Sequence, residues 1–128
     1  MGLKLNSIML GSEDSKQLAD FYSNVLGQPN AEWSDPANGW FVFEAGSSGL
    51  VIGPHSDVKG QNSQPGRLMF NLETPDVKGE FERIKAAGAT VVAEPYSPGG
   101  GGDGAPEMTM CTFADPDGNY FQLASPMG

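Results

Sequence analysis

The chain is poor in several residues on which common functions depend. Its 128 residues include one cysteine, Cys111, which can form no internal disulfide, and one histidine, His55. Seven basic residues against 16 acidic ones give a net charge of −9, which would repel nucleic-acid phosphates. No apolar run approaches the roughly 20 residues that span a bilayer, and residues 1–7 do not resemble a secretory signal. We therefore expect a cytoplasmic protein that binds neither nucleic acid nor membrane.

The chain does contain an internal repeat. At an offset of about sixty residues, Ile8-Met9-Leu10 matches Leu68-Met69-Phe70, and Phe21 matches Phe81. Each copy opens with an apolar run, continues into an amphipathic segment that glycine ends, and goes on to strand-like runs. Because neither copy can bury its apolar face alone, the two should pair around a shared interior. A cleft between them would be a natural ligand site.

The local patterns predict an α+β fold with the order β-α-β-β-β in each copy. One helix should begin after Asp14 and end at Gly27, and the other should begin at Thr74 or Asp76 and end at Gly88. Strands are predicted over 3–10, 40–43, 49–52, 67–72, 90–93, 108–113 and 120–123, and the run 115–119 predicts a tight turn between the last two. We expect a single domain over 1–128, made of module 1–56 and module 65–125, which a polar linker joins.

Three motifs carry a resemblance to a known family. They are Asp20-Phe21-Tyr22 with Val25-Leu26-Gly27, the segment Ala86-Ala87-Gly88-Ala89, and the run 115–119 (DPDGN) followed by 120–123 (YFQL). Together they resemble the vicinal oxygen chelate superfamily of glyoxalase I, bleomycin-resistance proteins and extradiol dioxygenases. The resemblance implies two paired β-α-β-β-β modules that form a curved mixed sheet around a cleft, and usually a homodimer.

The resemblance also implies where a metal would bind. Metal-dependent members carry His, Gln or Glu at four strand positions, which correspond here to Ser7, Val51, Arg67 and Gln122. Arginine and valine offer no lone pair, and serine and glutamine are weak ligands for a transition metal. We therefore expect a metal-free site with no cofactor, unless unforeseen donors such as Glu44, His55 or Glu107 recruit an ion.

Strand alternation assigns residues to the expected cleft. Ile8 and Leu10 share one face of the first strand, which leaves Ser7 and Met9 on the other, and the later strands divide in the same way. The predicted ligand-binding residues are Ser7, Met9, Trp40, Arg67, Met69, Asn71, Tyr120 and Gln122. The guanidinium of Arg67 could bind an anionic group of a ligand, or it could pair with a nearby acidic residue. His55 could be a base at the cleft rim or an ordinary loop residue.

The sequence favours one function and leaves two alternatives. The first is a metal-free protein that binds a small organic molecule and sequesters a drug or metabolite, as the resemblance to bleomycin-resistance proteins implies. The second is an enzyme, a glyoxalase-type lyase or isomerase, and the sequence identifies no catalytic residues for it. The third is a protein-interaction module without a ligand. The acidic charge favours a cationic ligand, whereas Arg67 favours an anionic one.

Overall fold

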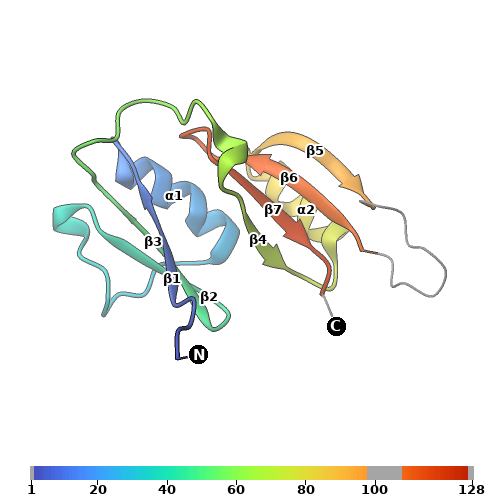
Figure 1. The fold of residues 1–128 in the computed structure, drawn as a ribbon, viewed down its shortest axis with the longest axis horizontal. Coiled ribbons are helices and arrows are strands. Elements are labelled where there is room, and N and C mark those ends of the chain that lie inside the picture. The colour runs from blue at the N-terminus through green and yellow to red at the C-terminus, as the bar shows by residue number, and fades with distance from the viewer. Residues whose placement is uncertain (1, 98–107, 127–128) are drawn as a thin grey trace. The chain divides into compact units, whose positions relative to one another are not determined.

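The computed structural model describes residues 2–97 and 108–126. The chain divides into two compact units, residues 1–61 (unit 1) and 62–128 (unit 2), each a small sheet with one long helix (Figure 1). No helix in the described residues is long and apolar enough to cross a membrane.

Unit 1 is a three-stranded mixed sheet with one α-helix. Its elements in chain order are β1 (Ser7–Gly11), α1 (Ser15–Leu26), the 3-10 helix η1 (Pro36–Asn38), β2 (Phe41–Ala45) and β3 (Ser48–Gly53). The strand order is β1-β3-β2, in which β3 runs parallel to β1 and antiparallel to β2. Helix α1 packs against β2 and β3.

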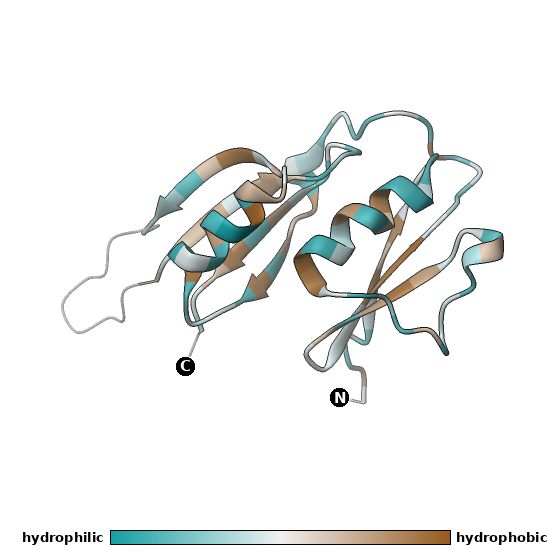
Figure 2. Cartoon of the chain, turned by 180° about the vertical axis from the view of Figure 1, so that it is seen from behind, coloured by the Kyte–Doolittle hydropathy of each residue, from teal (hydrophilic) through white to brown (hydrophobic). Residues whose placement is uncertain are grey.

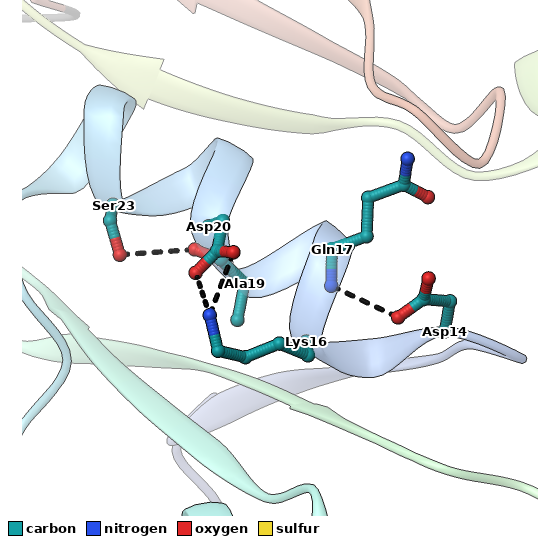
Figure 3. Close-up of polar contacts among 6 residues, drawn as sticks. All are labelled: Asp14, Lys16, Gln17, Ala19, Asp20 and Ser23. Atoms are coloured by element: carbon teal, nitrogen blue, oxygen red, sulfur yellow. Dashed lines mark hydrogen bonds and ion pairs between the residues drawn. The ribbon is translucent and has the colours of Figure 1, made fainter.

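Helix α1 forms where the sequence predicts it. The carboxylate of Asp14 accepts a hydrogen bond from the backbone N–H of Gln17 at 3.1 Å, which caps the helix (Figure 3). Gly27, with φ of 90°, ends it. The buried apolar side chains recur at helical spacing, and the largest are Leu18, Tyr22 and Val25.

Unit 2 is a four-stranded mixed sheet with one α-helix. Its elements are the 3-10 helix η2 (Pro65–Arg67), β4 (Phe70–Glu73), α2 (Val77–Ala86), β5 (Thr90–Tyr96), β6 (Met110–Ala114) and β7 (Tyr120–Ala124). The strand order is β4-β7-β6-β5, with β4 and β7 parallel and the other pairs antiparallel. Asp76 caps α2 by accepting from Gly79 N–H at 3.0 Å.

An aromatic stack fills the space between α2 and its sheet. The ring of Phe113 stacks on Phe81 of the helix with centroids 5.4 Å apart, and on Phe121 at 5.5 Å. Beside them Cys111 is fully buried, and burial raises the pKa of its thiol more than a backbone hydrogen bond at Leu123 lowers it. The thiol is thus a packed, neutral core group. In Figure 2 the outer turns of both helices are largely hydrophilic, and the strands behind them carry hydrophobic segments.

The α+β class is confirmed, with one difference in strand count. Unit 2 has the predicted order β-α-β-β-β. Unit 1 has three strands, in the three segments predicted to form strands, which is one strand fewer than that order requires. The predicted turn at 115–119 also forms: Asp115 Oδ1 accepts from the N–H groups of Asp117 and Asn119, and Gly118 has φ of 82°.

Candidate functional site

Each sheet has one face under its helix and one face turned away from it, which we call the far face. In unit 1 the paired residues of the far face form three rows across β2, β3 and β1. The rows are Glu44–Gly49–Ser7, then Val42–Val51–Met9, and finally Trp40–Gly53–Gly11, in which Trp40 directly precedes β2.

A pocket opens at the last row of unit 1, at the carboxyl ends of the parallel strands β1 and β3. Its volume is about 230 Å³, slightly below the roughly 300–1,000 Å³ of sites that enclose a drug-sized molecule. It therefore suits a small ring system, or one part of a larger molecule. The lining residues are Met9, Leu10, Gly11, Trp40, Gly53, Pro54, His55, Asp57 and Val58.

The pocket brings together two of the residues predicted from sequence. Met9 is 63% exposed, an unusual environment for a large apolar side chain in a strand. The ring of Trp40 lies over the backbone of Gly53. An aromatic ring and a thioether on one wall offer the dispersion and stacking contacts that a flat organic ligand needs.

His55 and Asp57 form the polar part of the lining. The imidazole Nδ1 of His55 accepts a hydrogen bond from the backbone N–H of Asp57 at 3.1 Å. A nitrogen that accepts carries no proton, so the proton of the neutral ring is on Nε2, which can donate to a ligand oxygen. Asp57 contributes the only formal charge among the lining residues.

The far face of unit 2 carries a polar row. Asn71 of β4, Gln122 of β7 and Thr112 of β6 are register partners. The amide Nε2 of Gln122 donates to Thr112 Oγ1 at 2.9 Å, and both side chains are buried. The side chain of Gln122 is thus bound to the neighbouring strand of its own sheet.

Arg67 does not lie on a strand, contrary to the expectation from alternation. It ends the 3-10 helix η2, and β4 begins only at Phe70, because the Pro65-Gly66 turn tightens into a helical turn rather than extending. Its Nε and Nη2 donate to Gln64 Oε1 at 3.0 and 2.8 Å, and the side chain is exposed. A role for Arg67 in ligand binding stays a prediction without the strand position that motivated it.

The remaining predicted residues lie in both units. Met69 is 42% exposed and precedes β4, so it also lies outside a strand. Ser7 and Tyr120 are half-buried at the first positions of β1 and β7. Contact of Ser7, Met69 and Tyr120 with a ligand stays a prediction.

The residues at the family's metal positions do not fit a transition metal. Val51 lies in the middle row of unit 1 between Val42 and Met9, and none of these three offers an ionisable donor. Within the described residues, no group of three or more His, Cys, Asp and Glu side chains is placed to hold an ion. Of the other donors considered, Glu44 is exposed in β2, and Glu107 lies outside the described residues.

Sequence reasoning missed the segment that closes the pocket. Pro54, Asp57 and Val58 follow β3 in a polar stretch that reads as a linker, and the sequence alone shows no partner that would orient His55. One signal was available, since both parallel strands end in glycine. Gly11 and Gly53 are register partners, and paired glycines leave room for side chains from elsewhere.

Comparisons with known proteins agree with this architecture. The glyoxalase-like domain family matches residues 7–124. The anthracycline biosynthesis proteins DauV of Streptomyces sp. (strain C5) and DnrV of Streptomyces peucetius are both 27% identical over 126 residues. The match covers 89% of this chain but only 44% of each relative, so the chain spans less than half of their length.

Solved structures show the same fold. A glyoxalase/bleomycin resistance protein/dioxygenase family enzyme from Burkholderia phytofirmans PsJN superposes with a TM-score of 0.73 at 19% identity, over 96% of this chain and 98% of that one. A glyoxalase-related enzyme from Fulvimarina pelagi gives 0.71 at 22% identity, over 98% and 92%. With a family match over almost its whole length, the chain belongs to the glyoxalase-like domain family of the vicinal oxygen chelate superfamily.

Proposed function

We propose that unit 1 binds a flat organic molecule in the pocket at the ends of β1 and β3, without a metal ion. The observation that carries the proposal is the apolar wall of Met9 and Trp40 beside the imidazole of His55. Such a lining, mostly apolar with a few polar groups, is typical of small-molecule sites. Stacking on an aromatic ring contributes about 0.5–1.5 kcal/mol beyond the area that it buries.

The charge of the pocket favours a cationic ligand. Asp57 lies in the lining, and the chain carries a net charge of −9, which would draw a cation toward it. The argument for an anionic ligand rested on Arg67, and that guanidinium is hydrogen-bonded to Gln64 outside the strands. We infer that the ligand combines a flat ring system with a basic group and an acceptor oxygen.

The relatives supply a chemical class that fits these requirements. DauV and DnrV are described as anthracycline biosynthesis proteins. An anthracycline has a planar fused-ring chromophore with carbonyl oxygens and an amino sugar. A pocket of about 230 Å³ would hold part of the ring system and leave the sugar outside. Sequestration of such a drug or metabolite is the role we propose.

Calorimetric titration with daunorubicin, a cationic anthracycline, tests the proposal. We expect saturable binding that EDTA does not change. Trp40→Ala should weaken binding more than tenfold, which corresponds to about 1.4 kcal/mol, because the stacking wall is lost. Trp33→Ala is the matched control, since Trp33 is 64% exposed and is not among the residues that line the pocket. Equal losses in the two variants would contradict the assignment of the site.

The enzyme alternative has two forms. If a glyoxalase-type lyase or isomerase uses an ion held by unforeseen donors, EDTA should abolish turnover and a divalent metal should restore it. If it runs acid-base chemistry without a metal, it should turn over a substrate in EDTA. Homodimerisation, a cytoplasmic location and the absence of nucleic-acid binding also stay predictions from the sequence.

A further inference from the structure

The row of residues at the pocket of unit 1 consists of Trp40 and two glycines, Gly53 and Gly11. Gly53 of β3 and Gly11 of β1 are register partners, and Trp40 precedes the β2 residue that pairs with Ile52. Neither glycine has a positive φ, so the backbone conformation alone would accept any residue at both positions. Space, rather than conformation, must explain why these positions carry no side chain.

The space above Gly53 is filled by the indole ring of Trp40. A Cβ on Gly53 would overlap Cε3 and Cζ3 of that ring and would lie 2.6 Å from Cδ2. The six-membered part of the Trp40 ring therefore packs against the backbone of Gly53. Above Gly11 the fit is looser: a Cβ there would lie 3.0 Å from His55 Cβ and 3.1 Å from Val58 Cγ2.

We propose that Gly53 is a positioning residue for the ligand, an inference that rests on the proposed function. Because Gly53 has no side chain, the Trp40 ring packs directly on the backbone of β3. This contact determines how far the ring projects into the pocket. A methyl group at position 53 would lift or rotate the ring into the pocket, and a flat ligand would then lose both the stacking surface and the room it needs. Trp40 contacts the ligand, and Gly53 acts through Trp40.

The chain offers a closely matched control on the same strand and face. Gly49 also belongs to β3, and its added Cβ would meet Phe43 O at 3.5 Å and Ser7 Cβ at 3.7 Å, which are ordinary van der Waals distances. Gly49→Ala thus makes the same chemical change as Gly53→Ala without touching Trp40. Any general effect of placing alanine in β3 should be common to the two variants.

The experiment uses the full chain with Trp33→Phe, which leaves Trp40 as the one tryptophan. We expect Gly53→Ala to shift the Trp40 emission maximum and to weaken daunorubicin binding at least tenfold. Gly49→Ala should do neither. In a Trp40→Ala background, Gly53→Ala should weaken binding less than twofold further, because the residue through which it acts is gone.

Four results would overturn the proposal. They are an unchanged emission spectrum in Gly53→Ala, retained affinity in that variant, an equal effect of Gly49→Ala, and a full additional loss of affinity in the Trp40→Ala background. If the parent does not bind daunorubicin, the proposed function fails, and the emission spectra still decide whether Gly53 seats Trp40. If Gly53→Ala does not fold, the double variant with Trp40→Ala should fold, and failure of both would also contradict the account.

Discussion

The two units pair their strands in the same way but differ in what their far faces present. In both, the first strand runs parallel to the last, and the last is antiparallel to the one before it. By this pairing, the apolar row Val42–Val51–Met9 of unit 1 corresponds to the polar row Thr112–Gln122–Asn71 of unit 2. The same scaffold thus carries an apolar pocket in one unit and a hydrogen-bonded row in the other.

The helix sides of the units differ far less. Leu18, Tyr22 and Val25 of α1 are buried at the same spacing as Val77, Phe81 and Ile84 of α2. A side chain between a helix and a sheet must be apolar and of suitable size, because interiors are close-packed. The far faces carry apolar side chains in one unit and polar ones in the other, so they are where a difference in function can arise.

The largest expected effect tests the correspondence of the helices. Phe81→Ala should lower the free energy of unfolding by about 3–5 kcal/mol, since it empties a core site stacked on Phe113. Phe21, which the sequence repeat aligns with Phe81, is only half-buried, so Phe21→Ala should cost about 1–2 kcal/mol. Urea unfolding followed by circular dichroism measures both. Equal costs would mean that Phe21, and not Tyr22, is the counterpart of Phe81.

A smaller effect tests the polar row of unit 2. Gln122→Leu should cost about 1–3 kcal/mol, because it leaves Thr112 without its side-chain partner in a buried place. Adding Thr112→Val makes the row resemble the apolar row of unit 1, and most of the lost stability should return. The midpoints of thermal unfolding of the two variants and the parent measure the loss of stability and its recovery. A double variant less stable than the single one would show that the hydrogen bond is not the reason for the cost.

The smallest effect concerns the helix caps, in which the units agree. Asp14→Ala and Asp76→Ala should each cost about 1 kcal/mol, since each carboxylate accepts from the backbone N–H three residues on. Gln17→Ala is the control, because the N–H that binds Asp14 is a backbone group and survives the change. Denaturant midpoints would measure the three costs. A loss in Gln17→Ala as large as in Asp14→Ala would argue against the backbone cap.

The sequence predicted the elements well where local chemistry decides them. Asp14, Asp76, Gly27 and Gly88 mark the helix ends, and the turn after Asp115 forms as expected. The sequence alignment of Phe21 with Phe81 differs by one residue from the burial pattern, since Tyr22 occupies the core position. An offset in a weak repeat depends on tertiary packing, which one sequence does not reveal.

The candidate site was predictable only in part. Alternation brought Met9 and Trp40 to one face, but Arg67 was assigned to a strand that begins three residues later. The closing segment with His55 and Val58 has no periodicity, and its place above Gly11 depends on a long-range contact. Patterns of period two report strand faces and say nothing of what a loop covers.

Amide chemical-shift mapping during a daunorubicin titration in EDTA tests the central claim most directly. We predict saturable shifts centred on Met9, Gly11, Gly53 and the segment 55–58 of unit 1. Shifts centred on the unit 2 row (Asn71, Thr112 and Gln122), or shifts that appear only after a divalent metal replaces EDTA, would contradict it.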